Sequence, residues 1–323
     1  MFILEGKAEI GSFIFNSLND VEITKSVEEL SDTAVIKLPT RFKVKQNDEQ
    51  KFTEDAIKVG DKVVITLGYQ DKYSGVEFSG FVKKISPKIP LEIHCEDAMY
   101  LLRRKNITRS WLTATTVKEV LQEVVLGTPI TLAENIPGIK LDKWIIRNAN
   151  GAQVLESLKK DFGLTIFIND QAKLYCGLEA LTNVGQTVVY DLNYNLVAND
   201  LEFKTKDDRR IKVEYEYIDP KTNKRKTVEV GDADGEKRSF KTSEVSDEAK
   251  LKEFAESKID KLKYDGFDGD VTTFLIPFAT RGMKAKLLDV DHKNREGNYF
   301  IKKVVTTLGS GGARRKVSLS YKI

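Results

Sequence analysis

The sequence predicts an α+β fold that is mainly β, with two small β-barrel domains and an α/β module between them. Apolar and polar residues alternate along short segments at both ends of the chain, as in half-buried strands. Between these ends lie two segments with the spacing of amphipathic helices, each preceded by a capping signal. We therefore expect a first barrel over residues 1–104, the α/β module over residues 105–185, and a second barrel with one long helix over residues 186–323.

The composition is that of a globular protein with enough apolar residues for real cores. The 323 residues are 41% hydrophobic and 31% charged, and the formal net charge is +3. Because positive and negative charges nearly balance, we expect no strong electrostatic attraction for a polyanion. No apolar run approaches the ~20 residues that span a bilayer, and the first residues lack a signal-peptide pattern, so we expect no membrane insertion. Cys95 and Cys176 are expected to be buried free thiols in a reducing compartment.

Strand patterns fill the first hundred residues, with a polar loop or flap expected over residues 39–54. Gly60 and Asp61 open a predicted strand, and a second strand returns from Phe78. Gly80 lies inside this returning strand, where a glycine predicts a bulge or a sharp barrel corner. A short connection bounded by two prolines then leads to a third strand.

The third strand ends at a predicted helix over residues 98–102. Cys95 is expected on one face of this strand and Glu96 on the other. Asp97 is expected to cap the helix, because its side chain can accept a hydrogen bond from the first amides. Glu96 and Asp97 are also the best-placed pair of carboxylates for glycoside hydrolysis, but capping is the preferred interpretation.

The order of these glycines, the FSGFVKKI strand, the proline-bounded joint and the CEDAMYLL corner resemble the late control protein D family of phages. The resemblance is strongest over residues 59–104 and continues in order over the rest of the chain. It implies a baseplate hub of a contractile tail, akin to the hub half of type VI secretion spike proteins. Such a hub is a ring-shaped homotrimer that joins the tail tube to the central spike, contacts other baseplate proteins, and meets DNA only as cargo in its lumen.

The middle of the chain changes from strand to helix patterns. Thr116 and Glu119 form a predicted capping box ahead of an amphipathic helix. Asn150 and Gln153 give the same signal for a second helix. A hairpin is expected to follow, with its turn at residues 169–170.

The last part of the chain returns to strands around one charged helix, expected over residues 246–264. The segment after Gly282 resembles the segment after Gly60, and the run FIKKV after Gly297 resembles the run FVKKI after Gly80. This internal echo fits a duplicated barrel, which the hub family resemblance also implies.

No cofactor, metal or catalytic site is expected. His94 and Cys95 face opposite sides of a strand, and neither a Gly-x-Ser-x-Gly elbow nor a Gly-Lys-Ser/Thr phosphate loop occurs. Two basic loop tips are interpreted as solvated turns, with partner contact as the alternative. They comprise Lys221, Lys224, Arg225, Arg314 and Arg315.

The sequence therefore predicts a structural, non-enzymatic hub, made in the bacterial cytoplasm and assembled into a virion tail baseplate or injection particle. The alternatives are a tail-tip peptidoglycan hydrolase and a β-rich module that binds host glycans. No spike-like segment follows the last predicted strand, so the central spike is expected to be a separate polypeptide.

Overall fold

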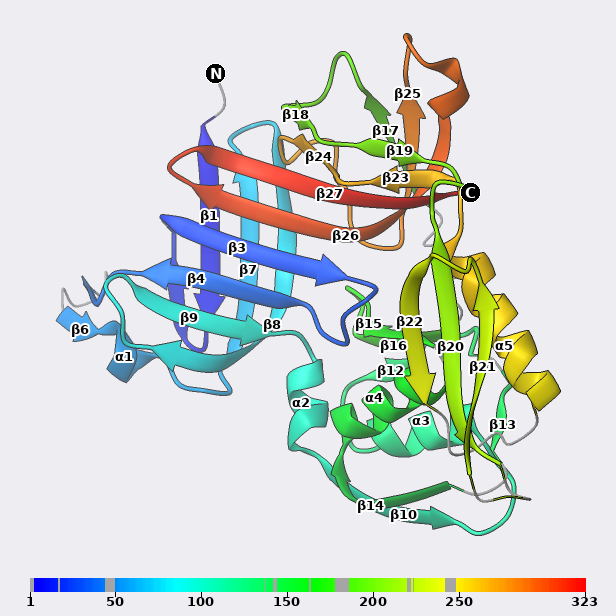
Figure 1. The fold of residues 1–323 in the computed structure, drawn as a ribbon. Coiled ribbons are helices and arrows are strands. Elements are labelled where there is room, and N and C mark those ends of the chain that lie inside the picture. The colour runs from blue at the N-terminus through cyan, green and yellow to red at the C-terminus, as the bar shows by residue number, and fades with distance from the viewer. Residues whose placement is uncertain are drawn as a thin grey trace.

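The computed structural model confirms the mainly β class, with a smaller share of helix (Figure 1). It describes residues 3–16, 18–43, 50–136, 138–141, 144–162, 164–177, 186–219, 222, 224–241 and 248–323. The predicted division into three domains stays a prediction.

One 15-stranded sheet forms the body of the protein. Its path runs through β18 (Ala198–Asn199), β24 (Asp270–Thr273), β27 (Gly312–Lys322), β26 (Gly297–Gly309), β3 (Asp20–Ser26), β4 (Thr33–Leu38), β9 (Leu91–Glu96), β8 (Tyr73–Ser86), β7 (Lys62–Tyr69), β1 (Leu4–Ile10) and β2 (Phe13–Phe15). Four strands branch from this path: β17 (Thr187–Asp191), β19 (Glu202–Lys204), β23 (Gly266–Asp268) and β25 (Lys284–Leu288).

The expectation of closed barrels is wrong, because the two halves of the chain share this sheet. β26 pairs with β3 in antiparallel register from Lys303–Ser26 to Leu308–Val21. A barrel closes only when its own first and last strands pair. Here the edge of β3 is occupied by a strand from the other end of the chain, so the sheet continues instead of closing (Figure 1).

Three large apolar clusters follow the three parts of the chain. The first lies among β1, β3, β4 and β7 to β9, and Leu275, Leu308 and Ala313 reach it from the C-terminal half. The second fills the α/β module, and the third lies among the C-terminal strands. Apolar burial is thus organised in three places although the sheet is continuous.

The α/β module lies beside one end of the sheet (Figure 1). Its helices are α2 (Met99–Arg104), α3 (Val117–Val125) and α4 (Gly151–Phe162). Its strands are β10 (Asn106–Trp111), β11 (Thr115–Thr116), β12 (Thr131–Leu132), β13 (Lys140–Leu141), β14 (Trp144–Asn150), β15 (Thr165–Ile168) and β16 (Lys173–Gly177). The hairpin of β15 and β16 confirms the predicted turn at residues 169–170.

Both predicted capping boxes are confirmed. Glu119 N donates to Thr116 Oγ1 at 3.2 Å, and Thr116 N donates back to Glu119 Oε2 at 3.1 Å. Gln153 N donates to Asn150 Oδ1 at 2.9 Å, and Asn150 N donates to Gln153 Oε1 at 2.8 Å. These bonds satisfy amides that a helix start would otherwise leave unpaired.

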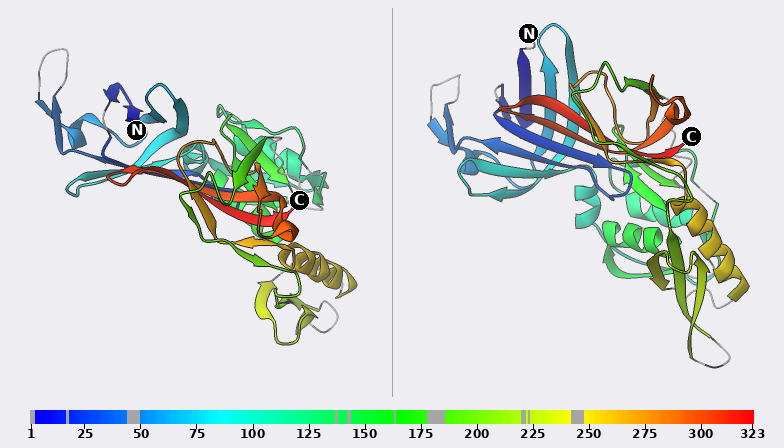
Figure 2. Two further views of the ribbon diagram at one scale, coloured as in Figure 1. Left: turned by 90° about the horizontal axis from the view of Figure 1, so that it is seen from above. Right: turned by 45° about the horizontal axis from the view of Figure 1, so that its top comes forward.

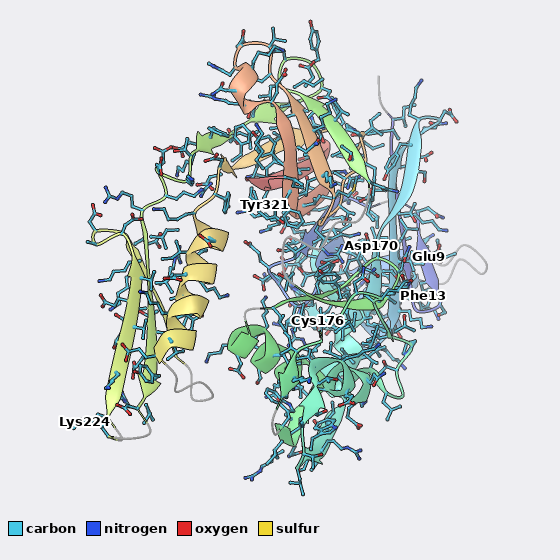
Figure 3. All side chains as sticks on the ribbon, turned by 90° about the vertical axis from the view of Figure 1, so that its right-hand side faces the viewer. Glu9, Phe13, Asp170, Cys176, Lys224 and Tyr321 are labelled. Carbon is cyan, nitrogen blue, oxygen red and sulfur yellow. The ribbon has the colours of Figure 1, made fainter. Side chains whose placement is uncertain are left out.

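A separate unit projects from the sheet between β19 and β23 (Figures 2 and 3). It contains β20 (Ile211–Ile218), β21 (Arg225–Gly231), β22 (Glu236–Lys241) and helix α5 (Glu248–Leu262). The expected start of this helix at residue 246 falls outside the described residues. The short elements that remain are β5 (Arg41–Lys43), β6 (Gln50–Phe52), α1 (Thr53–Ala56) and η2 (Lys293–Arg295).

Candidate functional site

The same backbone arrangement occurs at Gly60 and at Gly282. Gly60 N donates to Val82 O at 2.8 Å, and Val82 N donates to Asp61 O at 2.8 Å. Gly282 N and Ile301 N make the corresponding hydrogen bonds at 2.8 and 3.0 Å. Both glycines have positive φ, 100° and 82°, a conformation that disfavours a side chain. The two segments are therefore similar in backbone structure as well as in sequence.

The FVKKI and FIKKV runs also match in detail. β8 has a register shift between Val82 and Lys84, and β26 has one between Ile301 and Lys303. Each bulge thus falls on the first lysine of its run. The two bulged strands bend at the same place relative to their glycine corners.

Gly80 and Gly297 do not occupy corresponding positions in the two strands. Gly80 pairs with Val63, and the residue in the corresponding position of β26 is Tyr299, which pairs with Ala285. Gly297 pairs with Leu287, two positions away. The unequal glycine spacing in the sequence reflects this difference.

The internal repeat extends well beyond the glycine corners. Its N-terminal copy contains β3, β4, β7, β8 and β9, and its C-terminal copy contains β18–β19, β23–β24, β25, β26 and β27. Across the sheet the order β18–β24–β27–β26 is followed by β3–β4–β9–β8, so corresponding strands occur in the same order. We call these the N-terminal and C-terminal repeats.

Strand registers agree between the two repeats. In the N-terminal repeat, β3 and β4 pair so that Glu22 lies opposite Val35. In the C-terminal repeat, the shared register of β18–β19 with β23–β24 puts Asp200, the counterpart of Glu22, opposite Asp270. One departure is the outer strand, since β1 is antiparallel to β7 whereas β17 is parallel to β25.

Gly80 is required for a close backbone approach and not for a bulge or a positive φ. A Cβ at Gly80 would lie 2.2 Å from Glu96 O and 2.9 Å from Asp97 Cα. The bulges of β8 lie on either side of it, at Glu77 and Lys83. The prediction of a bulge at Gly80 is thus corrected to a crossing of strand β8 over the start of the Asp97 corner.

Asp97 accepts a hydrogen bond from the first amide of helix α2, as predicted, although the N-cap position itself is Ala98, and it also binds the loop after β3. Its Oδ1 accepts from Met99 N at 2.9 Å, and its Oδ2 accepts from Asp32 N at 2.9 Å. Asp97 is 6% exposed and Asp32 is 4% exposed. The second bond joins two segments that are 65 residues apart in the sequence.

Arg281 connects this corner to the α/β module. Its Nη2 lies 2.6 Å from Asp32 Oδ2 and donates to Ile168 O at 2.6 Å, while its Nη1 lies 3.2 Å from Asp170 Oδ1. Lys25 Nζ reaches the same Asp170 oxygen at 2.8 Å. We call Lys25, Asp32, Asp97, Asp170 and Arg281 the corner cluster, because it joins both repeats to the hairpin of β15 and β16.

Burial and charge act in opposite directions in the corner cluster. Burial raises the pKa of Asp32 to about 6 against the opposing charge of Arg281. Burial, together with the nearby Asp32, also holds the pKa of Asp97 well above its usual range. Burial would raise the pKa of Asp170 too, but Lys25 and Arg281 outweigh it and lower that pKa to about 2. Three carboxyl groups facing two cations therefore favour retention of a proton.

Glu96 lies on the other side of the same corner and is fully buried. Its Oε1 accepts from Arg103 Nε at 2.7 Å and from Ser31 Oγ at 3.0 Å, and Lys83 Nζ lies 3.3 Å away. Phe78 and Cys95 belong to the first apolar cluster, and burial raises the pKa of Cys95 to about 12. The Glu96 and Asp97 carboxylates therefore hold structure at this corner, and neither lies free at a surface.

Among the predicted loop residues, the prediction for Arg315 is the one that differs most from the structure. The sequence places it at a solvated turn, but it lies on β27 with an exposed fraction of 1% and forms an ion pair with Glu77. Its guanidinium also donates to Ala279 O at 3.1 Å and to Leu275 O at 3.1 Å. The turn is shorter than expected, and Arg315 lies on the strand face that points into the molecule.

The other basic residues lie nearer to the surface. Lys224 is exposed at the far tip of the projecting unit (Figure 3), and Arg225 lies 3.3 Å from Glu216. Arg314 is half-buried, with its guanidinium 4.9 Å from the ring centroid of Phe274. Lys221 falls outside the described residues.

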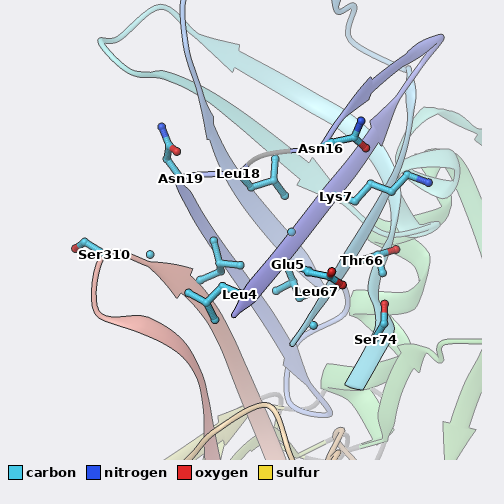
Figure 4. Close-up of a pocket in the computed structure, with 14 residues that line it drawn as sticks. Leu4, Glu5, Lys7, Asn16, Leu18, Asn19, Thr66, Leu67, Ser74 and Ser310 are labelled. Carbon is cyan, nitrogen blue, oxygen red and sulfur yellow. The ribbon is translucent and has the colours of Figure 1, made fainter. Parts of the chain in front are cut away.

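Two grooves accompany these features. A groove of about 660 Å³ lies between strand β1, the residues that precede β3 and the turn of β26 and β27, and Leu4, Asn19 and Ser310 lie on its walls (Figure 4). A second, of about 420 Å³, is lined by the corner cluster residues Lys25, Asp32, Asp97 and Asp170 and by Gly80.

Within the described ranges, no group of three or more His, Cys, Asp or Glu side chains is placed to hold a metal ion. No described helix combines the length and apolar character needed to cross a bilayer.

The fold, though not the sequence, matches known proteins over the whole chain. No protein-family model matches the sequence, and no curated protein matches it either. The 43 kDa tail protein of prophage MuSo2 from Shewanella oneidensis has a TM-score of 0.70 at 15% identity, with 99% of this chain and 98% of that chain covered. The tail protein from Neisseria meningitidis MC58 has a TM-score of 0.64 at 13% identity, with 98% and 96% covered.

A third structure belongs to a secretion machine. The E. coli c3393 protein, a component of the type VI secretion system described as structurally similar to the T4 tail proteins gp27 and gp5, has a TM-score of 0.61 at 8% identity, with 98% of this chain and 78% of that chain covered. The chain thus has the fold of phage tail proteins and of related secretion components. The fold resemblance predicted from the sequence is confirmed.

Proposed function

We propose that the chain is a structural baseplate hub of a contractile phage tail or a related injection system. In this role it joins the tail tube to the central spike as a ring-shaped homotrimer. It is made in the bacterial cytoplasm and assembled into the tail baseplate or injection particle, where it also contacts other baseplate proteins. DNA meets it only as cargo passing through the ring.

The internal repeat is the observation that carries this proposal. A chain with two copies of one strand arrangement, joined edge to edge by β26 and β3, can extend the same sheet to further copies of itself. A head-to-tail contact of this kind gives a closed ring when the rotation between copies closes. The whole-length fold match to two tail proteins supports the same setting.

The spike and tube partners are argued by analogy with the neighbours. One similar structure is a Francisella PdpA–VgrG complex, with a TM-score of 0.58 at 9% identity, of which this chain covers 60%. Fold similarity alone does not fix a partner. We propose that this chain likewise works within a multi-protein assembly.

A structural role also agrees with the state of the carboxylates. Glu96 and Asp97, the pair best placed in the sequence for glycoside hydrolysis, are 0% and 6% exposed and are bonded to other parts of the chain. A general acid or nucleophile must reach its substrate. We therefore propose that the chain is not an enzyme.

The test is co-assembly of the purified chain with the spike protein of the same tail. Light scattering should give a complex that contains three copies of this chain, and electron microscopy should show a ring. The chain alone is expected to be monomeric at low concentration. A persistent complex with a single copy of the chain contradicts the hub proposal, and clearing of peptidoglycan in a zymogram contradicts its non-enzymatic part.

A further inference from the structure

Two strand edges of the doubled sheet have no partner strand among the described residues. Residues 84–86 of β8 pair with β9 on one side only, since the ladder of β7 stops at Phe81. At the other end of the sheet, β18 and β19 pair only with β24 and β23. Figure 1 shows these strands at opposite ends of the front layer.

Both edges are more exposed than the corresponding residues inside the sheet. Lys84 is exposed and Ile85 is half-buried, whereas their counterparts in β26, Lys303 and Val304, are half-buried and buried. On the opposite edge Asn199 is exposed, whereas its counterpart in β3, Val21, is 1% exposed. What covers β26 and β3 is their contact with each other.

The contact of β26 with β3 is therefore a template for a contact between copies of the chain. The counterpart of β26 is β8, and the counterpart of β3 is β18–β19. We replace each residue of the β26–β3 contact by its counterpart in the other repeat. The pair Lys303–Ser26 then gives Lys84–Lys204, and the next pair, Val304–Lys25, gives Ile85–Phe203.

We infer that residues 84–86 of β8 in one copy pair antiparallel with β19 of the next copy, with Lys84 opposite Lys204. This inference rests on the proposed ring and names the surfaces that form it. The partner is a second copy of this chain, because β3 pairs with β26, the counterpart of β8, and a second copy supplies β18–β19, the counterpart of β3.

The side chains at this junction suit each other. Ile85 and Phe203 are half-buried apolar residues that lie at the rims of the first and third apolar clusters, so pairing brings the two rims together. Lys204 lies 3.3 Å from Glu202 and 3.2 Å from Asp268, and Arg209 also pairs with Asp268. The charge of Lys204 is thus already paired, which weakens its repulsion of Lys84.

The junction is short, because Pro87 follows Ser86 and cannot donate to a ladder. Proline at an edge also limits pairing with unrelated strands. Because so short a ladder forms few hydrogen bonds, we expect the ring to need a high concentration or a partner.

Disulfide trapping tests the register directly. Val27 N donates to Lys302 O at 3.0 Å, so the following pair, Lys303–Ser26, occupies a non-hydrogen-bonded position. Cα atoms in such pairs lie about 4.5 Å apart, within the range of about 4.4–6.8 Å that a disulfide spans. The double variant Lys84→Cys/Lys204→Cys should therefore cross-link between copies when the concentrated chain is oxidised.

The matched control is Lys84→Cys/Lys206→Cys, which moves one cysteine two positions along the same exposed segment and beyond disulfide reach. The native Cys95 and Cys176 are buried with pKa values raised to about 12 by that burial, so they exchange slowly. We expect at least tenfold more covalent oligomer from the first pair than from the control, on a non-reducing gel.

Equal cross-linking of the two double variants, or none in either, overturns the junction. The hub proposal is judged separately, by assembly of the unmodified chain with the spike protein. A ring that forms with the spike but is not trapped through Lys84 and Lys204 refutes only the junction.

Discussion

Arg315 and Glu77 form an ion pair in which Nη2 lies 2.7 Å from Oε1 and both side chains are 1% exposed. Arg315 lies on the last strand of the chain, whereas Glu77 is the bulged residue of β8 in the N-terminal repeat. Tyr73 Oη donates to the same carboxylate at 2.7 Å. The pair is therefore a buried, hydrogen-bonded ion pair that joins the two repeats.

Removal of either charge alone should lower the free energy of unfolding considerably. Arg315→Met leaves the Glu77 carboxylate buried without its cation, and such losses cost about 3–5 kcal/mol. We expect urea unfolding at pH 7 to report a fall of this size in the free energy of unfolding. The double variant Glu77→Leu/Arg315→Met removes both charges and should lose less than Arg315→Met does.

Arg314→Ala is the matched control, because Arg314 is adjacent in sequence but half-buried at the surface. Its cost should stay below about 1 kcal/mol, as for other surface positions. If Arg315→Met is no more destabilising than this control, the buried pair contributes nothing to the joint between the repeats.

Gly80→Val should destabilise the protein by about 3 kcal/mol or more, which is typical of overpacked backbone contacts. The reason is that the Cβ of the new side chain would approach Glu96 O to 2.2 Å, and neither strand can retreat without breaking the Asp97 corner. Thermal unfolding and the soluble yield measure this effect.

Gly311→Ala and Lys224→Ala provide controls for Gly80. A Cβ at Gly311 meets nothing within 4 Å, and Lys224 is exposed. Both variants should keep the melting temperature of the parent. A Gly80→Val protein that melts with them would show that strand β8 does not need a glycine at this crossing.

The corner cluster predicts a pH dependence of stability between about pH 4 and 6. The pKa of Asp32 is raised from 3.8 to about 6, so the folded state holds a proton that the unfolded state has released. The contribution of Asp32 is therefore greatest below pH 4 and falls as the pH rises to 6. Asp32→Asn should make the slope of unfolding free energy against pH less negative in this window. An unchanged slope would exclude Asp32 as its source, and Asp71→Asn, at an exposed turn, serves as the comparison.

Asp170→Asn should act in the opposite direction. The pKa of Asp170 is lowered to about 2, so its contribution is present above pH 4 and is lost as the pH falls to 2. Its side chain is 42% exposed, which limits the expected loss at pH 7 to about 1 kcal/mol. The difference from the parent should disappear near pH 2. A loss that persists at that pH would point to packing instead of charge.

Features that depend on neighbouring residues in the sequence are predicted correctly, whereas contacts between distant parts of the chain are predicted only in part. The capping boxes at Thr116 and Asn150 and the cap at Asp97 depend on neighbours within three residues, so the sequence contains all the information they need. Strand pairing between β3 and β26 joins residues 277 to 287 positions apart, from Lys303–Ser26 to Leu308–Val21. Neither strand alone contains a signal that identifies its partner. For this reason the strand patterns predict two closed barrels where the protein has one open, doubled sheet.

Arg315 shows a signal that is present in the sequence and easily missed. Ala313, Val317 and Leu319 alternate along β27 on its buried face, and Arg315 occupies the position between them with the same period of two. The neighbouring Arg314 and the glycine-rich turn suggest a solvated tip instead. The corner cluster has no comparable local signal, because its five residues come from four separate segments of the chain, with only Lys25 and Asp32 close in sequence.

The projecting unit of β20, β21, β22 and α5 occurs in only one of the two repeats. In the C-terminal repeat it connects β19 to β23, whereas the matching connection in the N-terminal repeat runs only from Ser26 to Thr33. In any cyclic assembly of n copies, the sheet therefore presents 2n similar units, whereas the projecting unit occurs n times. A neighbour with 2n-fold symmetry can contact every repeat of the sheet in the same way, and a neighbour with n-fold symmetry can do so through the projecting unit.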